Sequence, residues 1–222
     1  LAECGRPEAD EYHEYEQLLE AVDVDVMSLA LPIPMNAPAS IQALEAGFHT
    51  FCEKPVANSM RDARRLKQVV EETGLVYQVG FELRHSPLIQ SVMEHVESGR
   101  IGAVTSISGY HFWKPFEPHI EERQWGYDKW SGNVLFDCMS HTFDLINLLA
   151  GGRVQRVYAD LGHVSESYAD KEVPETGAVT IAYHNGVRSG VSFTETCDMP
   201  KVTILTVAGD DGKVEIDFSN AG

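Results

Sequence analysis

The chain has 222 residues, of which 43% are hydrophobic, so it is long enough to bury one large core or two smaller ones. Its formal net charge is −17, from 17 Lys and Arg against 34 Asp and Glu, which argues against nucleic acid as a partner. The densest basic cluster has the spacing of one solvated helix face, at Arg61, Arg64, Arg65 and Lys67.

The cysteines are far apart and form no Cys-x-x-Cys pair; they are Cys4, Cys52, Cys138 and Cys197. This spacing argues against a disulfide scaffold or a zinc ribbon and predicts reduced, mostly buried thiols, as in a cytoplasmic protein. No apolar stretch approaches the ~20 residues of a membrane span, and no signal peptide opens the chain, so no membrane partner is expected.

In the first part of the chain, helical and strand patterns alternate. Helices are predicted at 14–20, 38–46 and 59–72, and strands at 22–31, 48–52 and 75–80. A loop containing Pro32 and Pro34 follows the first strand. This alternation predicts part of a Rossmann-like α/β domain with a parallel sheet over residues 1–84. The glycine-rich turn Gly-x-Gly-x-x-Gly that should hold a dinucleotide pyrophosphate is absent.

Beyond residue 84 the pattern changes. Helices are predicted at 87–98 and 133–149, and strands at 103–112, 154–163, 177–184, 187–196, 202–207 and 213–218. Asn185-Gly186 is typical of a β-hairpin turn. Residues 85–222 are therefore predicted to form an α+β domain with an open, mostly antiparallel sheet.

The predicted helix at 133–149 is apolar except for a polar stripe. At ~100° per residue, the stripe occupies roughly a third of the circumference and contains Asn133, Asp137, Ser140, His141 and Asp144. Asp137 lies one turn before His141, where a carboxylate raises the pKa of an imidazole and fixes its tautomer, as a general base requires. Alternatively, the two side chains cap neighbouring loops or form a solvated stripe. A metal site is less favoured, because no third ligand has a telling spacing.

Lys54, in Glu53-Lys54-Pro55, ends a predicted buried strand, where α/β proteins bind ligands. Its ammonium group could stabilise negative charge on a substrate oxygen. A surface lysine paired with Glu53 is the interpretation that the tripeptide alone favours. Arg84 and His85 mark the junction of the two halves, and the aromatic segment that follows at 110–130 could contact a sugar ring or only pack a long loop.

Four segments in this order resemble the glucose-fructose oxidoreductase and inositol dehydrogenase family, also called Gfo/Idh/MocA. They are 24–32 (VDVMSLALP), 43–55 (ALEAGFHTFCEKP), 79–87 (VGFELRHSP) and 131–151 (SGNVLFDCMSHTFDLINLLAG). The resemblance implies that Lys54 binds the reacting oxygen, that His141 accepts the proton and that Asp137 modulates it. It also implies an NAD or NADP site lined by Pro32, Pro34, Glu53, Lys54 and Pro55, with substrate contacts from Lys54, Arg84, Asp137 and His141.

The resemblance further implies hydride transfer between the nicotinamide and a sugar, sugar derivative or cyclitol, and a homodimer or homotetramer formed through the second domain's sheet. Two alternatives are an NAD-dependent glycosidase or lyase of the same fold and a non-catalytic binding relative. The chain departs from the family at Asn36, where a His is common, and at Gly132-Asn133, where Gly-Gly is common. Because the glycine-rich turn and the last strands are missing, it is expected to be truncated at both ends.

Overall fold

A computed structural model describes residues 10–113, 137–168, 173–197 and 201–219. The chain divides into two compact units. The first consists of residues 1–31 and 35–79, and the second of residues 32–34 and 80–222.

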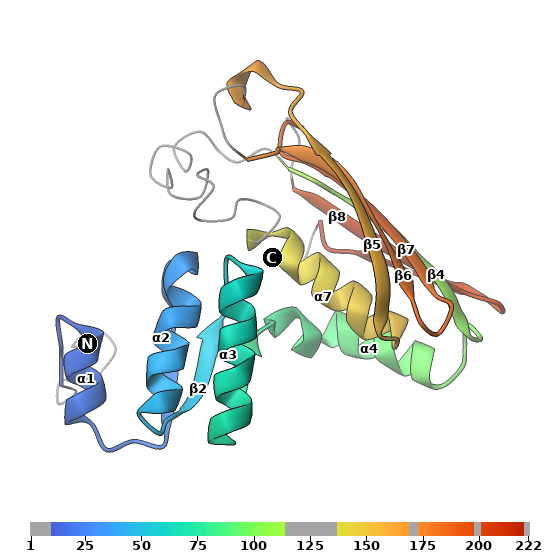
Figure 1. Cartoon of the computed structure of the whole chain (residues 1–222). Helices are drawn as coiled ribbons and strands as arrows, with labels where there is room; N and C mark the ends of the chain where they lie inside the picture. Colours follow the sequence, from blue (N-terminus) through green and yellow to red (C-terminus); the bar gives the residue numbers. More distant parts are fainter. Residues whose placement is uncertain (1–9, 114–136, 169–172, 198–200, 220–222) are drawn as a thin grey trace. The chain divides into compact units, whose positions relative to one another are not determined.

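The first unit contains a three-stranded sheet in the order β1-β2-β3 (Figure 1). Its strands are β1 (Val26–Leu29), β2 (His49–Glu53) and β3 (Tyr77–Gly80). β1 and β2 are parallel, with Val26 opposite His49 and Leu29 opposite Cys52. The helices are α1 (Tyr15–Ala21), α2 (Ile33–Glu45) and α3 (Met60–Thr73). Each strand therefore follows a helix, which is the predicted alternation.

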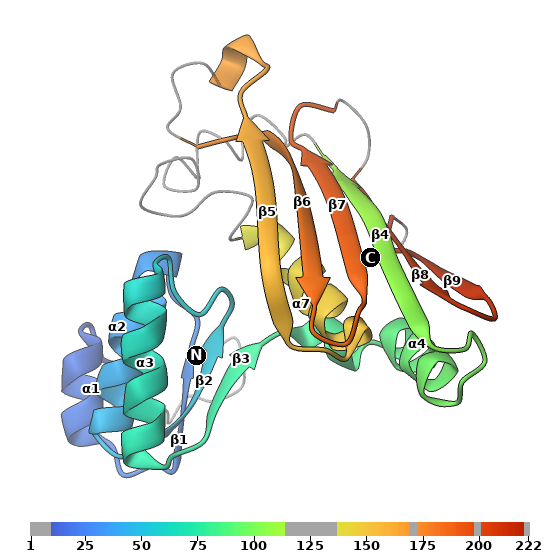
Figure 2. The same cartoon turned by 45° about the vertical axis from the view of Figure 1, so that its right-hand side comes forward.

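Helix α3 shows how local sequence sets these elements. Ser59 caps its first turn by accepting a hydrogen bond from the backbone of Asp62 at 3.1 Å, and Gly74 ends it with a φ of +65°. Its buried Leu66 and Val69 pack with Ala37, Leu44 and Ala57 in one apolar cluster. Helices α2 and α3 thus share a core on one face of the sheet (Figure 2).

The start of helix α2 corrects a prediction. The sequence predicts a loop through Pro34 and a helix from Pro38, but α2 begins at Ile33 and contains Pro38. Pro34 is accommodated because N–H groups in a first helical turn have no partner within the helix. Burial of Ile33 and Ala37, which are 6% and 2% exposed, stabilises the added turn.

The second unit is built on a six-stranded sheet in the order β5-β6-β7-β4-β8-β9 (Figure 2). Its strands are β4 (Val104–Phe112), β5 (Val154–Gly162), β6 (Thr176–Tyr183), β7 (Arg188–Thr194), β8 (Val202–Gly209) and β9 (Lys213–Asp217). β4 and β7 are parallel, and the other neighbouring strands are antiparallel. The predicted hairpin at Asn185-Gly186 joins β6 to β7.

Two helices cover one face of this sheet, α4 (Pro87–Glu97) and α7 (Met139–Ala150) (Figure 1). Their apolar side chains, including Ile89, Leu145 and Ile146, join those of the strands in one core. Short 3₁₀ helices, η2 (Glu82–His85) and η4 (Glu166–Tyr168), precede α4 and follow β5. The predicted fold class, a Rossmann-like parallel sheet followed by an α+β domain with a mostly antiparallel open sheet, is confirmed.

Three smaller predictions concern the cysteines, membrane spans and the start of the helix that contains α7. Cys52 is buried, whereas Cys138 and Cys197 are only half-buried, so the expectation of mostly buried thiols holds for Cys52 alone. Within the described ranges, no helix combines the length and apolar character of a membrane span. Asn133, the predicted start of the helix that contains α7, lies outside them.

Candidate active site

Lys54 directly follows β2, and a buried side chain from α2 holds the backbone on both sides of it. The Asn36 amide nitrogen donates hydrogen bonds to the carbonyl oxygens of Glu53 at 3.1 Å and Pro55 at 2.8 Å. Asn36 is fully buried. The backbone N–H of Lys54 donates to the Glu53 carboxylate at 3.2 Å, and the Lys54–Pro55 peptide is cis. Asn36 thus fixes the path of the chain through Lys54.

The sequence did not identify Asn36 as a site residue; it marked only a departure from the family pattern. Because Asn36 donates to two carbonyl oxygens, its amide nitrogen must point toward them, and Oδ1 of the same amide then points away from them. Oδ1 is buried and has no hydrogen-bond partner among the described residues. The signal that could have found Asn36 is a polar residue on the apolar face of a helix, four positions after Pro32.

Replacing Asn36 by Leu is expected to reduce both stability and turnover. Two buried carbonyls would lose their donor, which costs about 1–3 kcal/mol in the free energy of unfolding. A displaced Lys54 would lower kcat on the order of 10–100-fold. Chemical denaturation and steady-state kinetics measure the two effects. Ser40→Ala is the matched control. Ser40 is buried one turn later on α2, but its hydroxyl contacts that of Tyr77, at 3.3 Å, instead of the Glu53–Pro55 segment. An equal loss of kcat in both variants would contradict the role of Asn36.

His141 lies on α7, and its side chain is 18% exposed. Its ring meets that of Phe81 edge-on, with centroids 6.1 Å apart and planes at 79°. Nε2 lies 3.8 Å from a carboxylate oxygen of Glu82, whereas Nδ1 is buried. Of the two ring nitrogens, Nε2 is therefore the one that lies near a carboxylate. Neither Phe81 nor Glu82 was singled out from the sequence.

Asp137 lies two residues before α7, and its carbonyl oxygen accepts a hydrogen bond from the Ser140 hydroxyl at 3.0 Å. The sequence predicts both residues on one helix, but α7 begins after Asp137 and contains only His141, so their meeting in space stays a prediction.

Arg84 anchors the η2 segment to α7. Its guanidinium donates to both carboxylate oxygens of Asp144, with Nε 2.7 Å from Oδ2, and lies 5.9 Å from the centre of the Phe81 ring. These hydrogen bonds raise the pKa of Arg84. The Asp144 side chain is 8% exposed and that of Arg84 is 42% exposed. Asp144 thus belongs to the predicted polar stripe but binds Arg84, and the predicted substrate contact of Arg84 stays a prediction.

Removing Arg84 is expected to be costly for stability, because Asp144 would be left as a buried, unpaired carboxylate. Arg84→Ala should lower the free energy of unfolding by about 2–3 kcal/mol, less than for a fully buried pair because the guanidinium is partly exposed. Adding Asp144→Asn should restore part of this loss. A double-mutant cycle by denaturant unfolding measures the coupling, and additive single effects would show that the pair is not coupled.

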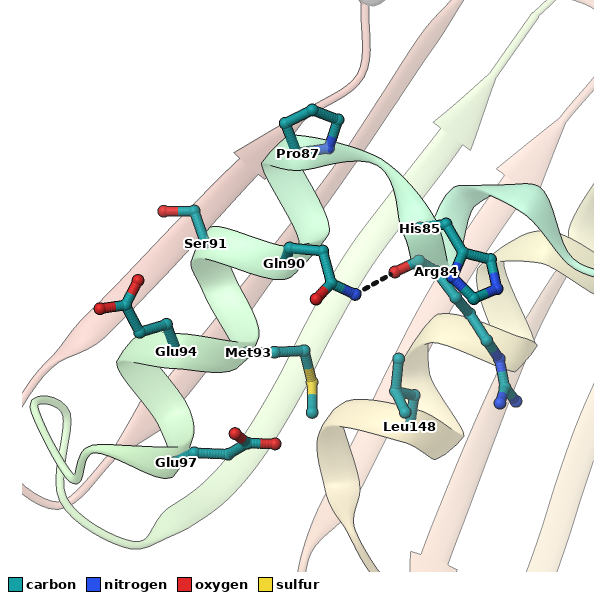
Figure 3. Close-up of a pocket in the computed structure, with 9 residues that line it drawn as sticks. All are labelled: Arg84, His85, Pro87, Gln90, Ser91, Met93, Glu94, Glu97 and Leu148. Carbon is teal, nitrogen blue, oxygen red and sulfur yellow. Dashed lines mark hydrogen bonds between the residues drawn. The ribbon is translucent and has the colours of Figure 1, made fainter.

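A groove of about 760 Å³ lies between α4 and α7, and Arg84 is one of the residues that line it (Figure 3). The carbonyl of Arg84 accepts a hydrogen bond from Gln90 at 2.7 Å. Met93, Glu94 and Glu97 are among the residues that line the groove. Neither Asp137 nor His141 lines it, so we place the candidate site at the start of α7 instead.

The remaining predicted residues can be placed individually. Glu53 is half-buried beside Lys54, Pro55 is buried, Pro32 is exposed and Pro34 lies in the first turn of α2. Lys54 belongs to the first unit, and Asp137 and His141 to the second. Their meeting in one site stays a prediction. Among the described residues, no group of three or more His, Cys, Asp and Glu side chains could hold a metal ion.

The sequence matches two family models that together cover most of the chain. Residues 2–81 match an oxidoreductase family with an NAD-binding Rossmann fold, and residues 89–215 match the Gfo/Idh/MocA C-terminal domain. The chain belongs to the Gfo/Idh/MocA family. The resemblance inferred from the sequence is therefore confirmed, and the Gfo/Idh/MocA family is one of NAD-binding oxidoreductases.

Among curated Gfo/Idh/MocA relatives, the chain is 30% identical over 209 residues to the uncharacterized oxidoreductase YrbE of Bacillus subtilis, covering 91% of this chain and 55% of that protein. It is 24% identical to scyllo-inositol 2-dehydrogenase (NAD(+)) of the same organism, covering 90% of this chain and 57% of that protein. The chain thus spans little more than half the length of these relatives.

Solved structures of the same fold include the WlbA dehydrogenase from Bordetella pertussis in complex with NADH and UDP-GlcNAcA. The TM-score is 0.86 at 23% identity, covering 97% of this chain and 65% of that one. A myo-inositol 2-dehydrogenase from Lactobacillus plantarum gives a TM-score of 0.81, also at 23% identity, covering 92% and 61%. At this identity the likeness shows the fold.

Proposed function

We propose that the protein is an NAD(P)-dependent oxidoreductase that oxidises a CH–OH group of a sugar, sugar derivative or cyclitol, or catalyses the reverse reduction. The observation that carries this proposal is His141, whose Nε2 lies 3.8 Å from the Glu82 carboxylate, in a chain of an NAD-binding oxidoreductase family. Residues 1–84 would belong to the cofactor-binding domain and residues 85–222 to the substrate-binding domain.

In the proposed reaction, His141 takes the hydroxyl proton of the substrate on Nε2. The carboxylate of Asp137 orients the imidazole and stabilises the imidazolium that forms. Lys54 donates a hydrogen bond to the reacting oxygen, where negative charge develops as the carbonyl forms. Arg84, held by Asp144, would border the substrate. Reduction runs through the same groups, with His141 returning the proton.

The described residues fit the nicotinamide end of a dinucleotide. Glu53, Lys54 and Pro55 lie at the carboxyl end of β2, where open α/β sheets bind ligands, and Asn36 fixes their backbone. Pro32 and Pro34 follow the neighbouring strand β1 and complete the proposed set. When bound, the nicotinamide supplies the hydride acceptor or donor. Both NAD and NADP are compatible with these residues.

The substrate class follows from the relatives and from the polar character of the site. Curated relatives include inositol 2-dehydrogenases, at 29% and 30% identity, and a levoglucosan dehydrogenase, at 26% identity. A carboxylate, an imidazole and a lysine suit a polyhydroxylated ligand, because each can hydrogen-bond a hydroxyl group. We extend this substrate class to the protein as part of the proposal.

A homodimer or homotetramer through the open face of the second unit's sheet is also proposed. In the described ranges, α4 and α7 lie on the opposite face (Figure 2). A cytoplasmic location completes the proposal and is supported by the free thiols of Cys52, Cys138 and Cys197.

Absorbance of the reduced cofactor tests the proposed function. The whole protein should produce NADH or NADPH when mixed with the oxidised cofactor and a panel of inositols and sugars. Product release from a glycoside without net cofactor change would favour the glycosidase alternative, which rests mainly on aromatic residues outside the described ranges. Cofactor binding with no turnover of either kind would favour a binding relative and overturn the proposal.

A further inference from the structure

Strand β5 is one edge of the six-stranded sheet (Figure 2). In the described part of the chain it pairs only with β6, so the backbone N–H and C=O groups on its outer side have no strand partner there. Of its nine residues, all except Gly162 are exposed, and the exposed fractions of Val157, Tyr158 and Leu161 are 55%, 67% and 40%. A long edge strand with exposed apolar side chains readily pairs with a strand of another chain.

The opposite edge strand, β9, is protected in ways that β5 is not. It has five residues, and its exposed side chains are those of Lys213, Glu215 and Asp217. Short length and charged side chains are two features by which proteins prevent edge strands from associating. β5 is almost twice as long and exposes mainly apolar and aromatic side chains. The comparison singles out β5 as the edge that another strand would join.

The face of β5 that points toward the helices is apolar. Val157, Ala159 and Leu161 line an apolar groove of about 530 Å³ together with side chains of β6 and α7, among them Phe143. Because β5 is an edge strand, the side of the groove formed by β5 has no neighbouring strand. Burial of exposed apolar side chains there would favour association.

The open face of β5 carries one charge of each sign. Side chains alternate along a strand, so Arg156, Tyr158 and Asp160 lie on the face opposite the groove. Neither Arg156 nor Asp160 forms an ion pair with another described residue. The two charges lie at equal distances on either side of Tyr158.

This arrangement makes β5 complementary to itself. In an antiparallel pair of β5 strands related by a two-fold axis through Tyr158, Arg156 lies opposite the partner's Asp160, and the symmetry forms this pair twice. On the other face, Val157 lies opposite the partner's Ala159. Opposite charges that face each other across an antiparallel pair stabilise it. If the axis is moved by one residue, Arg156 faces Tyr158 or Gly162 of the partner and the charge pairing is lost.

We propose that β5 is an interface with a second copy of this chain, in which two β5 strands pair antiparallel about Tyr158 and join two sheets into one. This contact uses the edge of the sheet and is therefore separate from the open-face contact proposed above. Two different two-fold contacts in one protein produce a closed tetramer. The inference does not depend on the proposed function, because association is measured without turnover.

Disulfide trapping tests the register. The whole protein carrying Tyr158→Cys is oxidised and analysed by electrophoresis without reductant, beside the unchanged protein, which accounts for the native thiols. Opposite residues of an antiparallel pair have Cα atoms ~4.5–5.5 Å apart, which suits a disulfide, so most of the chain should become a covalent dimer. Thr180→Cys is the matched control. Thr180 is exposed and pairs with Tyr158 across β5 and β6, so its two copies would lie three strand spacings, ~14 Å, apart. Equal cross-linking of the two variants would overturn the inference.

Reversal of the charges tests the complementarity. Asp160→Arg places two arginines opposite each other on both sides of the axis, so the dissociation constant measured by sedimentation should rise about 5–30-fold. Adding Arg156→Glu restores opposite charges and should return the constant to within about threefold of the original. Glu215→Arg is the matched control, because it changes the net charge equally but lies on β9. A double variant as weak as Asp160→Arg, or a whole protein that stays monomeric, would overturn the proposal.

Val157→Lys separates the edge contact from an open-face contact. Val157 is exposed on the helix side of the sheet, so an open-face dimer should not respond to its replacement. In the edge contact, a lysine would be placed among the apolar side chains that meet across the axis, and the dissociation constant should rise on the order of tenfold. Unchanged association in Val157→Lys would assign the dimer to the open face and remove β5 from the interface.

Discussion

Replacing His141 by Asn is expected to lower kcat by about 10²–10⁴-fold, the range typical for loss of a general base. Asn can occupy the space beside Phe81 but has no nitrogen that accepts a proton near neutral pH. Because Nδ1 of His141 is buried and the ring packs against Phe81, the substitution removes one reactive atom, Nε2, from an otherwise intact surface. Steady-state kinetics with the reduced cofactor as the signal measure the loss.

Two further observations separate this chemical effect from a structural one. Cofactor affinity, measured by fluorescence titration, should change by less than about threefold, since Glu53, Lys54 and Pro55 of the proposed cofactor-binding set lie in the other unit. His95→Asn is the matched control: His95 is half-buried on α4, and its Nδ1 lies 2.7 Å from the carbonyl oxygen of Ser91. Undiminished kcat in His141→Asn would remove His141 from the mechanism.

Replacing Lys54 by Met is expected to lower kcat by about 10²–10³-fold, the loss seen when one donor to a developing oxyanion is removed. Met has a similar length and flexibility, so the side chain can still occupy its place after β2, but it offers no hydrogen bond and no positive charge. The Asn36 hydrogen bonds go to the carbonyl groups of Glu53 and Pro55, so the backbone at position 54 should keep its path. The effect should therefore be on turnover, with little change in Tm.

Lys67→Met is the matched control for charge and side-chain type. Lys67 is exposed on α3, where it forms an i,i+4 ion pair with Glu71, and its loss should change kcat by less than about twofold and stability by less than about 1 kcal/mol. Equal kinetic losses in Lys54→Met and Lys67→Met would mean that net charge, and not the position of Lys54, determines the rate.

The regular elements were largely predictable because their signals are local. Ser59 and Gly74 bound α3 through capping interactions that lie within a few residues of the helix ends. Period-two alternation likewise predicted β6 and β7 and the turn at Gly186 between them. The start of α2 was missed because the local proline signal at Pro34 and Pro38 competes with burial of Ile33, and burial depends on the rest of the fold.

In the candidate site, too, some relations between residues rest on local sequence patterns and others do not. The expected relation of Asp137 to His141 rests on helical periodicity, which needs no knowledge of the fold, and it stays a prediction. Arg84 and Asp144 are separated by 60 residues, and Asn36 and Pro55 by 19, and no local pattern predicts such pairs. Glu82 was missed for the same reason, since an isolated glutamate in a sequence carries no sign of what it will face.

By itself, the sequence determined the family, the alternation of elements in the first unit, and the Lys54, Asp137 and His141 hypothesis, because order and spacing along the chain are sufficient for these. Only the tertiary structure decided what surrounds these groups. Asn36 fixes the backbone beside Lys54, and Glu82 lies 3.8 Å from Nε2 of His141. Burial and charge proximity arise when distant segments pack together, and they set how readily a side chain gives up or takes a proton.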